Sequence, residues 1–369
     1  MIYKRMMDTR HIAFFLPALY DGGAERVTVN LLKGMLEKDV QLDLVLASAD
    51  GPYLSQVPKE VRLVNLAAGR VVKAIQPLSR YLQQNRPSAL VSHLAHANVI
   101  AVAAKELART KTRLVLVEHN TLSASKSQLM RAKLVPPLMK WFYPRADEIV
   151  GVSQAVARDL ECQLGFDQGK VREIYNPVVN HQLITKSKMP VSHPWFRKDA
   201  PPVFLAVGRL SPQKDFLTLI QAFARLRKKM IARLVILGEG ESRGELEATI
   251  NRLGIAADVS MPGFVENPYA YMSKANALVL SSRWEGLPTV LIEAMACGCQ
   301  VIATDCPSGP AEILSAGQYG ILVPVGDSAA LSLAMLQVLK SPLNQDKLME
   351  RARYFSTERA VSEYLAILN

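Results

Sequence analysis

Short apolar runs in the first half of the chain alternate with stretches in which every third or fourth residue is apolar. The runs predict strands at His11–Leu16, Gln41–Ala47, Val61–Leu66, Ala89–His93, Arg113–Val117, Glu148–Val152 and Val171–Ile174. The periodic stretches predict helices at Ala24–Leu36 and Ala97–Leu107. Strands that alternate with helices indicate a parallel sheet covered on both faces.

The pattern fails between residues 180 and 202, a polar stretch rich in proline, and then restarts. Further strands are predicted at Val203–Val207, Arg233–Leu237, Val259–Met261, Ala277–Leu280, Val301–Ala303 and Gly320–Val323. The helices predicted among them are Phe216–Lys228, Arg243–Leu253, Thr289–Cys297 and Ser328–Lys340.

Two successive α/β units predict two Rossmann-like domains that face each other across a cleft. We place the N-terminal domain at residues 1–185, a linker at 186–201 and the C-terminal domain at 202–345. The last segment, 346–369, is expected to be a helix that could pack back on the N-terminal domain. Ligands of open parallel sheets bind outside the carboxyl ends of the strands, so the loops at those ends hold the candidate site.

Composition agrees with a folded protein of two domains, since 49% of the 369 residues are hydrophobic and 21% are charged. The net charge of +11 is uneven, with nine Lys or Arg and two acids between residues 105 and 145. Such a cluster fits nucleic acid, an anionic bilayer or a phosphorylated substrate. A solvated basic face without a partner is the alternative.

Neither a signal peptide nor a membrane span is predicted, and we expect a cytoplasmic protein. The basic first ten residues contain no apolar stretch, and the charge-free segment Pro87–Ala104 carries too many polar residues for a span. The cysteines lack zinc-site spacing and are expected to be small buried thiols. They are Cys162, Cys297, Cys299 and Cys306.

Two glycine-containing loops precede helices and fit phosphate groups. At Gly22 and Gly23, backbone N–H groups can meet a phosphate, although a turn without a ligand explains the pair as well. In the loop Gly208–Asp215, Arg209 and Lys214 are two cations that suit a diphosphate. The alternative is that they pair with neighbouring acids, Asp215 or Glu239.

A third loop and helix, Ser282–Gly298, carries two carboxylates in a largely apolar setting. Glu285 falls in the loop and Glu293 about one turn inside the helix, so one can reach a sugar while the other meets ribose hydroxyls. The free N–H groups of Thr289 and Val290 at the start of the helix point toward phosphates between them. Carboxylates in such a helix are not ordinary surface residues.

Taken together, three segments resemble the retaining glycosyltransferases of family four. They are the Glu-x7-Glu run Glu285–Glu293, the loop Gly208–Asp215 and the segment Pro307–Ile313. The resemblance extends over nearly the whole chain, through Asp21–Arg26, Glu118–Asn120, Tyr175–Pro177, Leu237–Gly240 and Pro262–Phe264. It implies the GT-B fold and transfer of a sugar, with retention, from a nucleotide diphosphate sugar to an envelope glycan. UDP-sugars are the favoured donors, and lipid-linked or lipopolysaccharide-type glycans the favoured acceptors.

The resemblance also implies roles for individual residues. Donor contacts would come from Arg209 and Lys214 (diphosphate), Glu293 (ribose), Glu285, Gly286 and Leu287 (transferred sugar), and Gly263 and Phe264 (nucleobase). His119 would sit beside the anomeric carbon, although on its own it reads as a core or capping histidine. This chain departs from the family pattern at Leu287–Pro288, where many relatives carry a Phe-Gly pair.

No Asp-x-Asp pair occurs in the sequence, so the usual metal ligands of single-domain transferases are missing and protein cations would stabilise the leaving diphosphate. No metal or other cofactor is expected. Two other functions stay open: a nucleotide-sugar epimerase of GT-B architecture and, more distantly, a basic nucleic-acid-binding protein.

A basic and apolar segment in the first half predicts contact with the inner face of the cytoplasmic membrane. Its candidate residues are Lys126, Arg131, Lys133, Lys140 and Trp141. Cations and apolar residues partly separate at helical spacing, and tryptophan suits a bilayer interface. The alternative is a helix whose apolar face packs on the domain.

Overall fold

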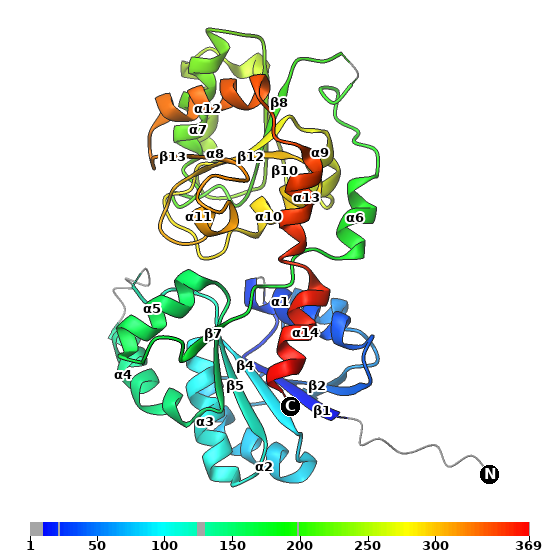
Figure 1. The fold of residues 1–369 in the computed structure, drawn as a ribbon, viewed down its shortest axis with the longest axis vertical. Helices are drawn as coiled ribbons and strands as arrows, with labels where there is room; N and C mark the ends of the chain where they lie inside the picture. The colour runs from blue at the N-terminus through cyan, green and yellow to red at the C-terminus, as the bar shows by residue number, and fades with distance from the viewer. Residues whose placement is uncertain (1–9, 21–22, 124–129, 198, 369) are drawn as a thin grey trace, which may run out of the picture. The chain divides into compact units, whose positions relative to one another are not determined.

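The computed structural model describes residues 10–20, 23–123, 130–197 and 199–368, with the side chains of 130–135 excepted. It divides the chain into two compact units. The N-terminal unit consists of Met1–Pro177 and Thr357–Asn369, and the C-terminal unit is Val178–Ser356. The helix boundaries and strand boundaries below are those of the structure, and Figure 1 labels the elements.

The N-terminal unit is built on a seven-stranded parallel sheet in the order β3-β2-β1-β4-β5-β6-β7. Its strands are β1 (Arg10–Leu16), β2 (Val40–Leu46), β3 (Arg62–Asn65), β4 (Ala89–His93), β5 (Arg113–Glu118), β6 (Glu148–Gly151) and β7 (Val171–Glu173). Its helices are α1 (Gly23–Met35), α2 (Ile75–Asn85), α3 (Ala95–Ala108), α4 (Met130–Phe142), α5 (Gln154–Leu164) and α14 (Thr357–Ile367). The central strands are apolar without alternation because helices cover both faces of the sheet.

The C-terminal unit holds a six-stranded parallel sheet in the order β10-β9-β8-β11-β12-β13. Its strands are β8 (Val203–Val207), β9 (Arg233–Leu237), β10 (Val259–Gly263), β11 (Ala277–Leu280), β12 (Gln300–Thr304) and β13 (Ile321–Val323). Its helices are α6 (His181–Ser187), α7 (Phe216–Arg227), α8 (Arg243–Arg252), α9 (Pro268–Lys274), α10 (Thr289–Ala296), α11 (Pro310–Ile313), α12 (Ser328–Lys340) and α13 (Gln345–Arg353). Both sheets have the topology of Rossmann-like domains.

Helix α6 lies in the stretch where the hydrophobic pattern fails, and only its last two residues fall within the linker expected at 186–201. Asn180 starts this helix, because its Oδ1 accepts a hydrogen bond from the backbone N–H of Leu183 at 2.9 Å. Hydrogen bonds also tie α6 to α9: Ser273 Oγ donates to the carbonyl of Ser187 at 2.7 Å. A side-chain cap and a few tertiary contacts stabilise α6, and neither feature leaves an apolar periodicity in the sequence.

The C-terminal segment contains two helices rather than one. Helix α13 belongs to the C-terminal unit, while α14 belongs to the N-terminal unit and packs against α1. The approach is close at Gly34, where a Cβ atom would lie 2.5 Å from Cγ2 of Thr357 and 2.9 Å from Cγ2 of Val361. Only a residue without a side chain fits α1 at this crossing.

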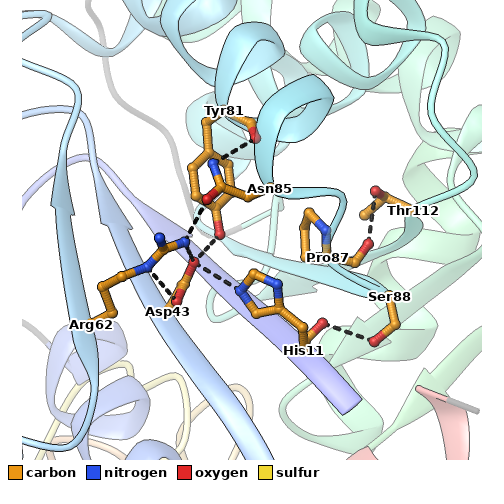
Figure 2. Close-up of polar contacts among 8 residues, drawn as sticks. All are labelled: His11, Asp43, Arg62, Tyr81, Asn85, Pro87, Ser88 and Thr112. Atoms are coloured by element: carbon orange, nitrogen blue, oxygen red, sulfur yellow. Dashed lines mark hydrogen bonds and ion pairs between the residues drawn. The ribbon is translucent and has the colours of Figure 1, made fainter. Parts of the chain in front are cut away.

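A buried carboxylate, Asp43 on β2, is satisfied by side chains from three other elements (Figure 2). His11 Nε2 lies 2.8 Å from Asp43 Oδ2, Arg62 Nε donates to Oδ1 at 2.9 Å, and Tyr81 donates to Oδ2. Burial opposes ionisation, but these hydrogen bonds outweigh it and lower the pKa of Asp43. The cluster lies where β1 and β3 begin, away from the carboxyl ends of the strands, and it stabilises the sheet.

Candidate active site

The carboxyl ends of β8, β9 and β10 bring three of the predicted segments together. The N–H of Gly208 donates to the carbonyl of Leu237 at 3.0 Å, and the N–H of Gly238 donates to that of Gly263 at 2.9 Å. Gly238 has a φ of 139°, and a Cβ atom there would lie 2.0 Å from the carbonyl oxygen of Gly208. Only glycine can occupy this position.

Lys214 and Glu285 form an ion pair within this edge of the sheet. Lys214 Nζ lies 2.5 Å from Glu285 Oε1, and Ser282 Oγ donates to the same oxygen at 2.6 Å. Both partners are largely buried, with exposed side-chain fractions of 19% for Lys214 and 7% for Glu285. Among the described residues, none bonds to the second oxygen, Oε2. The carboxylate is therefore fixed by one oxygen and can accept hydrogen bonds with the other.

Asp215 takes a different partner from the one considered in the sequence. It caps α7, accepting a hydrogen bond from Thr218 Oγ1 at 2.9 Å, and it pairs with Arg283 Nε at 3.1 Å. The backbone N–H of Arg283 also donates to the carbonyl of Gln213 at 2.8 Å. These bonds join the loop after β8 to the loop after β11, which places Lys214 beside Glu285.

Arg209 extends into solvent, with 76% of its side chain exposed. Its Nη2 lies 3.4 Å from Glu241 Oε2, a contact that contributes little at such exposure. The predicted alternative partner, Glu239, binds Arg243 instead, at 2.7 Å. Arg209 is thus free to turn its guanidinium toward an anion at the end of β8.

Glu293 is 5% exposed and lies inside α10, between buried apolar residues such as Ile292 and Ala294. Helix α10 begins at Thr289, and no side chain caps its first N–H groups. The preceding loop is held by Ser308 Oγ, which donates to the carbonyl of Glu285 at 2.8 Å. The remaining predicted donor contacts differ in exposure: Gly286, Leu287, Thr289 and Val290 are half-buried, Phe264 is 81% exposed, and Gly263 is buried.

In the N-terminal unit, the predicted residue His119 meets a second histidine, His93. His93 is the last residue of β4, and its Nδ1 lies 2.9 Å from Nε2 of His119, which follows β5. Burial lowers the pKa of His119 to about 4 and that of His93 well below its usual value, so both rings are neutral near pH 7. His93 was predicted at the end of a strand, without a functional role.

The neighbouring Glu118 is a buried carboxyl group. Asn98 Nδ2 donates to its Oε1 at 2.7 Å, and the Tyr143 hydroxyl donates to the same oxygen. Burial raises the pKa of Glu118 to about 7, although both hydrogen bonds act to lower it. This carboxyl therefore holds Asn98 and Tyr143 around the end of β5 and takes up a proton near neutral pH.

The predicted membrane segment is described in part. Lys126 lies outside the described residues, as do the side chains of Arg131 and Lys133. Within α4, Met139 is fully buried while Trp141 is 62% exposed and Lys140 is exposed. Arg145 stacks on the Trp141 ring, 4.8 Å from its centroid. One side of α4 thus packs on the domain through Met139, and Trp141 and Lys140 are exposed to solvent.

Two other predictions concern the glycine turn and the cysteines. Gly22 lies outside the described residues, and Gly23 is the first residue of α1 with open space around it. Cys299 and Cys306 are buried as expected, Cys297 is half-buried, and the expectation is wrong for Cys162, which is exposed on α5. No group of three His, Cys, Asp or Glu side chains among the described residues could hold a metal ion.

Comparison with known proteins identifies the family. Residues 21–180 match the model of glycosyltransferase family 4, and residues 192–355 match that of the group 1 glycosyl transferases. A Campylobacter jejuni protein, N-acetylgalactosamine-N,N'-diacetylbacillosaminyl-diphospho-undecaprenol 4-alpha-N-acetylgalactosaminyltransferase, is 31% identical over 368 residues, covering 95% of this chain and 94% of the relative. The chain belongs to the GT-B glycosyltransferases.

Further relatives of this glycosyltransferase agree with that assignment. The GalNAc-alpha-(1->4)-GalNAc-alpha-(1->3)-diNAcBac-PP-undecaprenol alpha-1,4-N-acetyl-D-galactosaminyltransferase of the same Campylobacter jejuni strain is 27% identical over 97% of this chain and 98% of its own. The solved structure of Anabaena Alr3699/HepE in complex with UDP superposes with a TM-score of 0.75 at 21% identity, covering 97% of this chain and all of the other. The structural likeness confirms the predicted GT-B fold of two parallel α/β domains.

The glycosyltransferase contains, in its described residues, no helix with the length and apolar character needed to cross a bilayer. The pairing of Lys214 with Glu285 could not be read from the sequence, because the residues are 71 positions apart. The sequence did contain a signal for the contact between His93 and His119, because β4 and β5 were predicted as consecutive strands. Strand β4 ends at His93, and His119 follows the end of β5.

Proposed function

We propose that this glycosyltransferase moves a sugar from a UDP-sugar to a lipid-linked or lipopolysaccharide-type glycan, with retention of the anomeric configuration. The observation that carries the proposal is the half-anchored carboxylate of Glu285. Its Oε1 is held by Lys214 and Ser282, while Oε2 remains available to sugar hydroxyls at the carboxyl edge of the sheet. The names of the relatives support the acceptor class, since two of them act on undecaprenol-linked glycans. The UDP complex of the structural neighbour supports the donor.

In this proposal, the donor's diphosphate lies between Arg209 and Lys214. Negative charge grows on the diphosphate as the bond to the sugar breaks, and cations that are already in place stabilise the transition state more than the bound donor. Lys214 is held in position by Glu285, and Arg209 is free to move. These cations would replace a metal ion, so activity should survive an excess of EDTA.

The other residues in the proposal bind the donor and take no part in the chemical step. Glu293 would accept hydrogen bonds from the donor ribose, and the loop at Gly263 and Phe264 would border the nucleobase. The backbone of Gly286 and Leu287 would face the transferred sugar together with Glu285. The first N–H groups of α10, at Thr289 and Val290, would meet phosphate oxygens because a helix start attracts anions. Gly22 and Gly23 would do the same at the start of α1.

His119 would lie beside the anomeric carbon and hold a hydroxyl of the donor or the acceptor. Because burial keeps its pKa near 4, the ring would act as a neutral hydrogen-bonding group near pH 7 and not as a cation. This role is separate from charge stabilisation by Arg209 and Lys214, so the two can be tested independently.

The acceptor proposal places the protein at an anionic bilayer on the cytoplasmic side, as a peripheral protein docked through the α4 segment. Exposed Trp141 and Lys140 support this placement, together with the cations Lys126, Arg131 and Lys133 of the same segment.

A product screen tests the proposal. Purified protein is incubated with UDP-, GDP- or ADP-sugars, with and without an undecaprenyl-diphosphate-linked oligosaccharide, and nucleoside diphosphate release and the glycan product are measured. Transfer from a UDP-sugar that requires the acceptor, survives EDTA and gives a product of unchanged configuration by proton NMR is expected. Activity only with other nucleotides, an inverted product, or an isomerised sugar formed without acceptor would overturn the corresponding part.

A further inference from the structure

His93 and His119 of the N-terminal unit contact each other through their ring nitrogens. Nδ1 of His93 lies 2.9 Å from Nε2 of His119, and the ring centroids are 5.2 Å apart. The backbone fixes this geometry, because the N–H of Leu94, just after His93, donates to the carbonyl of Val117, just before Glu118 and His119, at 3.2 Å. The rings are therefore held together by the register of adjacent strands.

A contact between two neutral imidazoles requires one nitrogen to carry the proton and the other to accept it. Burial lowers the pKa of both rings, so neither is a cation near neutral pH. Two arrangements are possible. Either His93 Nδ1–H donates to His119 Nε2, or His119 Nε2–H donates to His93 Nδ1.

The surroundings of His93 distinguish these arrangements. His93 is fully buried, and its other nitrogen, Nε2, has no hydrogen-bond partner among the described residues. The first arrangement leaves an unpaired acceptor at Nε2, and the second leaves an unpaired N–H donor there. Buried N–H groups without a partner are rarer in proteins than under-satisfied acceptors, so the first arrangement is favoured. The ring of Phe14 stacks on His93 with an interplanar angle of 18° and adds an apolar wall.

We infer that His93 is a positioning residue that donates its Nδ1–H to His119 Nε2 and thereby holds His119 in the tautomer protonated at Nδ1. No residue that the structure describes bonds to Nδ1 of His119, so this N–H can donate to an oxygen of the substrate. With Nε2 occupied, His119 has no free lone pair and acts as a donor, not as a base. The inference rests on the proposed function only in assigning the substrate as the recipient.

Nitrogen NMR of the whole protein tests the tautomer without any substrate. The six histidines are labelled with 15N, and long-range 1H–15N correlations show which nitrogen of each neutral ring carries the proton. His93→Asn and His119→Asn variants assign the signals. Protonation of both rings at Nδ1 is expected, whereas a His119 ring protonated at Nε2 would overturn the inference.

Kinetics of two variants test the consequence. His93→Leu removes the donor, whereas His93→Asn keeps an amide N–H close to the position of Nδ1. The Leu variant should lose about 10- to 100-fold in kcat, the size of effect found when the orienting partner of a metal-bound histidine is removed, with the donor KM little changed. The Asn variant should recover most of that loss. Equal impairment of both folded variants would mean that His93 only packs, and the inference would fail.

The His119→Ala variant separates this inference from the proposed function. An unchanged kcat in that variant would remove His119 from the reaction and with it the substrate as recipient. The tautomer would still be decided by the wild-type spectrum, because that measurement depends on His93 and His119 alone.

Discussion

Lys214 Nζ lies 2.5 Å from Oε1 of Glu285, and this pair is largely withdrawn from water. A lysine that binds a diphosphate in the proposed reaction thus already has a carboxylate partner before the donor arrives. Burying a charge without a partner is costly, so each residue of the pair depends on the other for stability as well as for function. Arg209, the second proposed cation, has no such dependence because it is exposed.

Lys214→Ala and Arg209→Ala should therefore differ. Lys214→Ala leaves the Glu285 carboxylate buried without its cation, and the free energy of unfolding should fall by about 1–3 kcal/mol along with kcat. Arg209→Ala should lower kcat but change the free energy of unfolding by less than about 0.5 kcal/mol. Denaturant unfolding and steady-state kinetics measure both, with the exposed Lys340→Ala as control. Wild-type kcat in either variant would show that the residue does not contact the leaving group.

Glu293→Ala should weaken donor binding more than it disturbs folding. If the carboxylate accepts paired hydrogen bonds from the ribose, its loss should cost about 1.5–3 kcal/mol of binding free energy. Calorimetric titration with UDP measures this, and Glu350→Ala on α13, an exposed glutamate of the same unit, is the matched control. A folded Glu293 variant that binds UDP like the wild type would contradict the assignment.

Glu118→Gln should change how stability depends on pH. The folded pKa of about 7 lies above the ordinary value of 4.5, so the folded state holds a proton that the unfolded state has released. The resulting stabilisation is fully present below about pH 4.5 and is lost as pH rises through 7. Relative to wild type, the Gln variant should gain up to about 3 kcal/mol between pH 4 and pH 8. Denaturant unfolding across this range measures it, and a constant difference would show that the pKa of Glu118 is the same in the folded and unfolded states. The exposed Glu60→Gln variant is the control.

Gly34→Ala should destabilise the N-terminal unit. The added methyl would overlap Thr357 and Val361 of α14, and overpacking of this kind costs about 1–3 kcal/mol, more than the helix propensity gained. Gly244→Ala on α8 is the matched control, because its Cβ would meet nothing within 4 Å. Thermal unfolding should show a lower Tm for the first variant and an unchanged or higher Tm for the second. Equal Tm values would mean that α14 moves aside at no cost.

The α4 segment should bind anionic vesicles. Each cation near the surface adds about 1 kcal/mol of attraction to acidic lipid, which salt weakens. Flotation with phosphatidylglycerol vesicles should recover the protein, and flotation with phosphatidylcholine vesicles should not. Replacing Lys126, Arg131, Lys133 and Lys140 with Ser should abolish recovery while UDP binding persists. Undiminished flotation of that variant would show that these cations do not bind the membrane and that the segment is a solvated face.

Elements with a continuous apolar run were predictable from sequence, and those formed by local caps were not. Strands β4, β8, β9 and β11 agree with the prediction residue for residue, because each contains an uninterrupted apolar run that is buried between the helices on both faces of the sheet. Helix α6 was not predicted, since it depends on the Asn180 cap and contacts with α9.

The candidate site shows the same contrast. The positions of Arg209 and Lys214 on the loop after β8 followed from the order of strands and helices. The partner of Lys214 did not, because the loop that carries Glu285 meets the loop after β8 only through hydrogen bonds and ion pairs between distant segments. Similarly, the contact between His93 and His119 depends on the register of β4 and β5.

Because α14 packs in the N-terminal unit, that unit cannot be completed during synthesis until α14 has been made. Val361 and Tyr364 of α14 are buried in the core of a unit whose other segment, Met1–Pro177, precedes the whole C-terminal unit in synthesis. The surface of α1 around Gly34 therefore remains uncovered until the whole C-terminal unit has emerged from the ribosome. Domains usually fold as they are made, the first one first. Here the N-terminal unit, which is synthesised before the C-terminal unit, is completed only after it. A nascent chain stalled before Thr357 would present an apolar surface to chaperones.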